Sequence, residues 1–166
     1  MKNWMLAVCA MAAVGGAQAH CDKPSDDLLK FLVPYAATNF AAIRGDAAGG
    51  GQYHLTPEAE QVCPNVFILE DAAAHDKYPE FWEVKYTSSQ TGTQDDVGVS
   101  VIKAFSPVLK AAGFQEKPYL NDGDDPGSWQ LEWDGPSDTW VTVDSYQDDD
   151  RPGVTSYEVR VAHNVK

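Results

Sequence analysis

The clearest pattern in the chain is a pair of alternating runs of apolar and polar residues, joined by a polar turn. Residues 129–134 and 140–146 alternate with period two and are rich in aromatic and β-branched residues, as half-buried antiparallel strands are. The connector, residues 134–138 (DGPSD), has the composition of a hairpin turn. We therefore predict a β-hairpin. The side predicted to face the core carries Trp129, Leu131, Trp133, Val141 and Val143.

Four further segments are predicted to form strands. Residues 52–56, 65–70, 81–88 and 155–164 combine alternating or continuous apolar runs with flanking turn residues. Residues 46–51 (DAAGGG) end in consecutive glycines and are predicted to form a loop. Because a two-stranded hairpin is only marginally stable, its apolar side needs the rest of the chain to cover it.

The first helical pattern covers residues 25–45. Ser25 suits the N-cap position, and apolar residues then recur at helical spacing until Gly45, which is expected to end the helix. Pro34 lies inside the pattern, so a kink or two short helices are expected.

The second helical pattern covers residues 95–112. Asp95 or Asp96 is the expected N-cap, Gly113 the expected stop, and Pro107 an expected interruption. Its apolar stripe consists of Val97, Val101, Ala104, Phe105, Val108 and Leu109.

The order of these elements is a helix and three strands, followed by a second helix and three strands. This order predicts an α+β fold of two αβββ units, with an antiparallel sheet and the helices packed on one face. No linker or change of composition divides residues 20–166, so they are predicted to form a single domain.

In outline, this order is similar to the tandem α/β repeats of β-lactamase inhibitory proteins, which hold a target against a curved sheet. The stretch Phe40-x-x-Ile43-Arg44-Gly45 also resembles small uncharacterised exported bacterial proteins. The first resemblance implies a binding role. It rests on topology, so no binding residue is carried over.

Residues 1–19 have the three parts of a secretory signal peptide. Lys2 supplies the basic start, residues 4–13 the apolar core, and residues 17–19 (AQA) a small-x-small cleavage site. The apolar run is too short for a membrane span, and no lipobox precedes Cys21. We therefore expect a periplasmic or secreted protein that begins at His20 and has no membrane anchor.

The chain is strongly acidic, with 25 Asp and Glu residues against 12 Lys and Arg residues and a formal net charge of −13. This balance argues against binding to nucleic-acid phosphates and to anionic membranes. It favours steering towards a basic partner, although a charge that only maintains solubility explains it as well. Oligomeric state does not follow from the composition.

Two cysteines remain after removal of the leader. Cys21 and Cys63 form an even pair in an oxidising compartment, so a structural disulfide is predicted. Zinc binding by two cysteines without a spaced His/Cys pair is disfavoured.

His20 is the sharpest candidate for chemistry. At a cleaved N-terminus, its α-amino group and imidazole would suit Cu(II), as in the histidine brace of copper monooxygenases. A brace needs a second histidine, for which His54, His75 and His163 are available, but no spacing selects among them. The alternative is that His20 merely follows the cleavage site. We expect no other cofactor.

Two weaker patterns suggest a hydrolase and a calcium site. His75-Asp76 with Ser88 or Ser89 lacks a nucleophile elbow, so the trio does not predict an enzyme. The acidic stretches 121–125 and 148–150 supply oxygen ligands, but their order does not fit a calcium loop, and solvated turns account for them.

The polar side of the predicted hairpin is the last candidate. If the apolar side packs against the helices, the other side presents aromatic residues among acids, which is typical of an interface anchor. The predicted partner-binding residues are Trp140, Tyr146, Asp144, Glu132, Glu158 and Arg160, with Phe81, Glu83 and Lys85 as an extension. The alternative is that Trp140 and Tyr146 only brace their cross-strand neighbours.

These observations favour a non-enzymatic binding protein, of inhibitor or immunity type, that caps a basic protein partner through this face. A copper site or enzyme centred on His20, and a periplasmic small-molecule carrier or structural protein, remain as alternatives.

Overall fold

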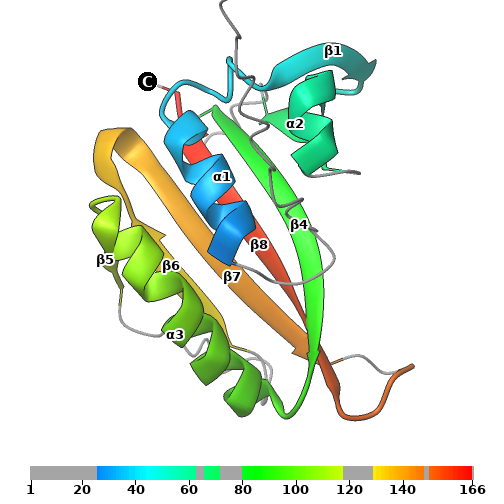
Figure 1. Cartoon of the computed structure of the whole chain (residues 1–166), viewed down its shortest axis with the longest axis vertical. Coiled ribbons are helices and arrows are strands. Elements are labelled where there is room, and N and C mark those ends of the chain that lie inside the picture. Colours follow the sequence, from blue (N-terminus) through cyan, green and yellow to red (C-terminus); the bar gives the residue numbers. More distant parts are fainter. Residues whose placement is uncertain (1–25, 63–65, 72–79, 118–128, 148–149, 166) are drawn as a thin grey trace, which may run out of the picture.

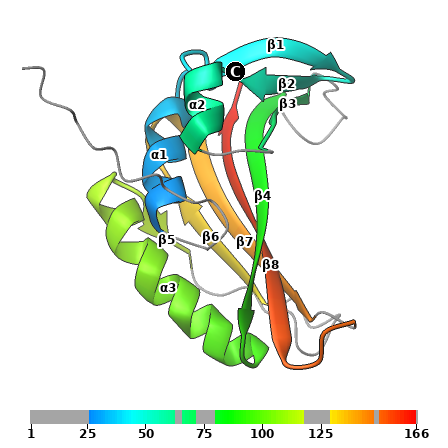
Figure 2. The same ribbon diagram turned by 45° about the vertical axis from the view of Figure 1, so that its right-hand side comes forward.

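The structure is a computed structural model, and it describes residues 26–62, 66–71, 80–117, 129–147 and 150–165. Its eight strands form one antiparallel sheet in the order β1-β2-β3-β4-β8-β7-β6-β5. The strands are β1 (Arg44–Gly49), β2 (Gln52–Leu55), β3 (Ile68–Asp71), β4 (Phe81–Thr91), β5 (Gln115–Glu116), β6 (Gln130–Asp134), β7 (Thr139–Gln147) and β8 (Val154–Asn164). The helices α1 (Asp26–Ala36), α2 (Pro57–Val62) and α3 (Gln94–Ala111) lie on one side of it (Figures 1 and 2). The predicted α+β fold is confirmed.

The sheet consists of two meanders joined through their last strands. Strands β1 to β4 form the first meander, β5 to β8 form the second, and β4 pairs with β8 at the centre. Helix α1 precedes the first meander and α3 precedes the second. Each unit therefore has one strand more than predicted, because the short strands β1 and β5 show no apolar alternation.

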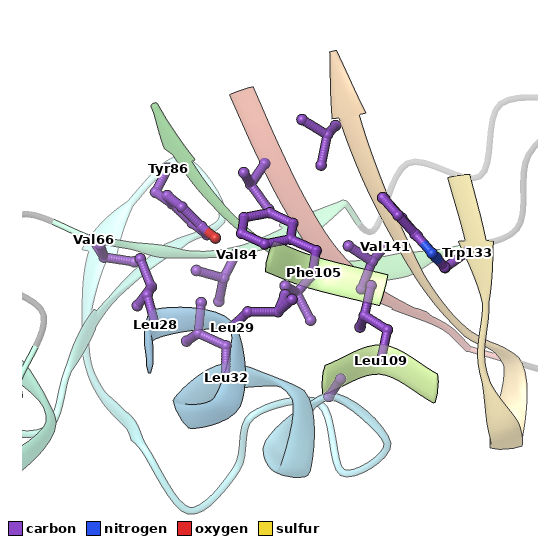
Figure 3. Packing of buried hydrophobic residues seen from close by; sticks show 14 of the residues in the cluster. Leu28, Leu29, Leu32, Val66, Val84, Tyr86, Phe105, Leu109, Trp133 and Val141 are labelled. Carbon is purple, nitrogen blue, oxygen red and sulfur yellow. The ribbon is translucent and has the colours of Figure 1, made fainter. Parts of the chain in front are cut away.

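The hydrophobic core lies between the sheet and the two longer helices. Leu29 and Leu32 of α1 and Phe105 and Leu109 of α3 are buried in one cluster with Val84 of β4 and Val141 of β7 (Figure 3). The five hairpin residues predicted to face the core are all buried, namely Trp129, Leu131, Trp133, Val141 and Val143, and so are Tyr157, Val159 and Val161 of β8. Burial of each such side chain contributes roughly 1.5–3 kcal/mol, so this face is what holds the sheet and helices together.

The first helix is shorter than predicted. Helix α1 ends at Ala36, and residues 37–43 form turns in which Asn39 and Phe40 have φ of 53° and 56°. This left-handed turn is costly for non-glycine residues, but it buries the Phe40 ring completely. The prediction that the helix continues to Gly45 is therefore wrong.

The predicted glycine-rich loop is instead a hairpin. Residues 44–49 form the exposed edge strand β1, and Gly50 and Gly51 turn the chain into β2 with φ of 62° and 77°. A Cβ on Gly51 would lie 2.7 Å from the carbonyl oxygen of Glu70, so this position requires glycine both for its φ and for the close approach.

Helix α3 corrects two further expectations. Its N-cap is Thr93, whose Oγ1 accepts a hydrogen bond from the Asp96 backbone N–H at 3.2 Å, so neither Asp95 nor Asp96 is the cap. The helix also runs through Pro107 to Ala111 without a break. Proline removes only one backbone hydrogen bond, and Phe105 and Leu109 anchor the helix to the core on both sides of it.

We expect Phe105→Ala to destabilise the protein by about 3–5 kcal/mol, because it removes a fully buried ring and leaves a cavity between α3 and the sheet. The matched control is Val99→Ala on the same helix, where the side chain is 66% exposed and the change should stay within about 0.5 kcal/mol. Urea denaturation followed by circular dichroism measures both. Equal midpoints for the two variants would contradict the assignment of the core.

Candidate functional site

The candidate site is the face of the sheet that points away from the helices, on strands β4, β8, β7 and β6 (Figure 2). Because the side chains of a strand alternate, the residues between the core positions point to this face. The register arranges them in rows across the strands. One row is Glu83, Ala162, Trp140 and Asp134. The next is Lys85, Arg160, Thr142 and Glu132, and the third is Thr87, Glu158, Asp144 and Gln130.

A hollow of about 480 Å³ lies on this face. Its volume is within the range of ligand-binding pockets, which is roughly 300–1,000 Å³. It is lined by Phe81, Glu83, Lys117, Glu132, Asp134, Trp140, Thr142, Arg160 and Asn164. The lining comes from β4, β6, β7, β8 and the residue after β5, so both meanders contribute to it.

The aromatic wall of the hollow consists of Phe81 and Trp140. Their ring centroids are 6.2 Å apart with an interplanar angle of 58°, a tilted contact across β8. The Trp140 indole N–H donates a hydrogen bond to Asn164 Oδ1 at 3.2 Å. Trp140 is therefore held in place while one part of the ring lines the hollow, so it braces its neighbours and remains available for contact.

The central cation of the face is Arg160. Its Nε donates to Glu158 Oε1 at 2.7 Å, and its Nη2 lies 3.8 Å from Asp144 Oδ2. Asp144 also accepts a hydrogen bond from Gln130 Nε2 at 2.6 Å. Burial alone would lower the pKa of Arg160, but the carboxylates of Glu158, Asp144 and Glu83 outweigh it and raise that pKa. The guanidinium is thus charged and already paired.

Lys117 closes the hollow at the β5 edge. Its backbone N–H donates to the Glu132 carbonyl at 2.8 Å and so extends the pairing of β5 with β6. Its Nζ pairs with the Glu132 carboxylate and lies 3.1 Å from Asp134 Oδ1. Hydrogen bonds to these two carboxylates raise the pKa of Lys117.

Glu83 is the buried acid of the site. It is 6% exposed, and Lys85 Nζ lies 3.7 Å from its Oε1, farther than an ordinary hydrogen bond. Burial raises the pKa of the Glu83 carboxyl, with a smaller contribution from Glu158, while the charges of Lys85 and Arg160 act in the opposite direction. The charges of Lys85 and Arg160 therefore do not fully offset the cost of burying the ionised Glu83 carboxylate.

The six predicted partner-binding residues all lie on this face, but the hollow includes only three of them, Glu132, Trp140 and Arg160. Tyr146 is 47% exposed and pairs with Ser156. It lies beyond the second and third rows, which contain the ion pairs and are called the ionic rows below. It lies six positions along β7 from Trp140, a distance of about 20 Å. The two aromatics therefore cannot act on one small group.

Four hollow-lining residues were not among the predicted binding residues, namely Lys117, Asp134, Thr142 and Asn164. Asn164 continues the alternation of Arg160 and Ala162, so extending the period-two pattern to the end of β8 would have found it. Lys117 follows a two-residue strand, which is too short to show a pattern.

Several sequence candidates lie outside the described residues: His20, Cys21, Cys63, His75, Asp76 and the acidic stretches 121–125 and 148–149. The disulfide stays a prediction, and the copper site stays an alternative. The hydrolase trio and the calcium loops, which the sequence did not favour, are likewise not tested. His163 is half-buried at the rim of the core, and its Nδ1 lies within hydrogen-bond distance of Asn39 Oδ1. His54 is exposed on β2.

Among the described ranges, no three His, Cys, Asp or Glu side chains are arranged to hold a metal ion. In the same part of the chain, no helix is long and apolar enough to cross a membrane. Comparison with protein-family models, curated proteins and solved structures finds no match to this chain.

We expect Glu83→Gln to change how stability depends on pH. A carboxyl whose pKa is raised by folding binds its proton more tightly in the folded state, so it stabilises the protein below its ordinary pKa of 4.5. That stabilisation is lost as the pH rises through the raised value. The free energy of unfolding of the wild type should therefore fall, relative to that of the variant, between about pH 4 and about pH 7.

Urea midpoints at both pH values measure this difference. Glu60→Gln on the exposed surface of α2 is the matched control and should follow the wild type. A Glu83→Gln variant whose stability keeps the pH dependence of the wild type would show that burial does not control this acid.

Proposed function

We propose that the protein is an exported binding protein of inhibitor or immunity type, which caps a basic protein partner through the open face of its sheet. The observation that carries this proposal is the hollow of about 480 Å³, with an aromatic wall beside buried and half-buried carboxylates. Aromatic residues in a desolvated centre with polar surroundings are the usual anchors of protein interfaces.

Charge supports a basic partner. On strands β4 and β6 to β8 and at Lys117, the open face carries the carboxylates Glu83, Glu132, Asp134, Asp144 and Glu158 and the cations Lys85, Lys117 and Arg160. Carboxylates are in excess, and the whole chain has a net charge of −13. Such a field accelerates encounters with a positively charged surface and opposes encounters with an acidic one.

A small-molecule carrier is the second candidate, favoured by the volume of the hollow. The two candidate functions differ in how much of the open face the ligand would contact. A protein partner covers the ionic rows and Tyr146 together with the hollow, whereas a small molecule contacts the hollow alone.

The test is to immobilise this protein and to measure which basic proteins it retains from the exported fraction of the producing cells. Trp140→Ala should weaken retention by about 2 kcal/mol, roughly thirtyfold, because it removes the aromatic anchor. Tyr146→Ala should weaken it independently and by less, since Tyr146 lies at the edge of the face. Retention should also fall as salt is raised, since the association is electrostatically steered.

Phe67→Ala is the control, because Phe67 is a similarly exposed aromatic, 37% accessible, that precedes β3. Retention unaffected by Trp140→Ala and Tyr146→Ala would exclude this face as the binding surface. Loss with Trp140→Ala alone, together with retention of a small molecule, would favour the carrier.

A further inference from the structure

The hollow combines two features, and a ligand complementary to both must be cationic and must also stack on an aromatic ring. Phe81 and Trp140 provide an aromatic wall, and carboxylates stand on both sides of it. Glu83 on β4 lies on one side, whereas Glu132 and Asp134 on β6 lie on the other, beyond β8 and β7.

We propose that this hollow is the anchor site for a single arginine side chain presented by the basic partner. The inference rests on the proposed function and specifies its central contact. The guanidinium stacks against Trp140, and the carboxylates that line the hollow on either side attract its positive charge.

The existing cations do not make the hollow a site for anions. Lys85 pairs with Glu83 and Glu158, each at 3.7 Å. Arg160 and Lys117 likewise each contact two carboxylates. An entering anion would have to compete with these pairs against an excess of negative charge, whereas an entering cation is attracted by it.

The aromatic wall favours arginine over lysine. A guanidinium is planar, less strongly hydrated than an ammonium, and stacks on an indole while its N–H groups reach carboxylates in its own plane. The chain already contains one contact of this kind. Arg44 Cζ lies 4.2 Å from the Trp82 ring centroid and 5.3 Å from that of Tyr53, on the face of the sheet opposite the hollow.

Glu83 gains most from such a ligand. The charged groups that face it are Lys85 on its own strand and Arg160 and Glu158 on β8, and burial outweighs the two cations and raises its pKa. A guanidinium in the hollow adds a second partner for the ionised carboxylate. Binding should therefore weaken on acidification, as Glu83 takes up a proton.

The experiment is a titration of the purified full-length exported protein with N-acetyl-arginine N-methylamide. The readout is the ¹⁵N–¹H signal of the Trp140 indole, assigned by its loss in Trp140→Phe. We expect the arginine compound to shift this signal. The lysine compound should bind at least about fivefold more weakly, and the neutral citrulline compound should cause no shift at the same concentration.

Variants test the carboxylates. Glu83→Gln and Glu132→Gln should each weaken arginine binding by about three- to tenfold, whereas Glu60→Gln on α2 should leave it unchanged. Circular dichroism confirms that each variant is folded. Because Glu83→Gln removes no side-chain volume, loss of binding in a folded variant reports on charge.

Equal binding of the lysine and arginine compounds would overturn the choice of arginine. A Trp140 signal that no compound shifts would overturn the anchor site. Neither result would contradict the proposed function. That function fails if Trp140→Ala and Tyr146→Ala retain the basic partner as well as the wild type does.

Discussion

The pairing of β4 with β8 is the constraint on which the rest of the structure depends. Both strands have eleven residues, and their register runs without a break from Phe81↔Asn164 to Thr91↔Val154. Each strand ends one meander, so in the described part of the chain this ladder joins the two halves into one sheet. Its register also determines that Val84 lies beside Val161 in the core, while Lys85 lies beside Arg160 on the open face. The core and the candidate site are therefore two sides of the same ladder.

The period-two alternation of the long strands made much of this fold predictable. Trp133, Val141 and Tyr157 face the helices because a strand in a one-sided antiparallel sheet must direct one set of side chains to the core. The parts that could not be predicted are those where the local sequence carries no pattern of apolar residues or favours a different structure. Strand β1 is exposed and glycine-rich, β5 has two residues, and the helix through Pro107 persists because tertiary packing outweighs one lost hydrogen bond.

The sequence predicted which side of the sheet carries the site, but it did not predict which residues of that side lie together. Alternation identified Trp140, Tyr146 and Arg160 as sharing one side of the sheet, since that requires only their positions along each strand. Which of them meet depends on the register between strands that are distant in sequence. Phe81 reaches Trp140 across β8 only because Phe81 pairs with Asn164 and Trp140 with Ala162. Ala162 matters here, since a small residue between two aromatic positions leaves room for their rings to approach.

The ionic rows bear on selectivity more than on stability. Half-exposed ion pairs such as those of Arg160 and Lys117 contribute about 0–1 kcal/mol each, so their loss would scarcely unfold the protein. Among the described residues, Lys85, Lys117 and Arg160 are nevertheless each paired with carboxylates of the face, whereas the buried carboxylate of Glu83 is paired with Lys85 at the long distance of 3.7 Å. A surface built in this way offers an incoming anion no free counter-charge and offers an incoming cation a poorly compensated acid beside an aromatic ring. The preference for a basic group therefore follows from how the charges are paired, in addition to the net charge of the chain.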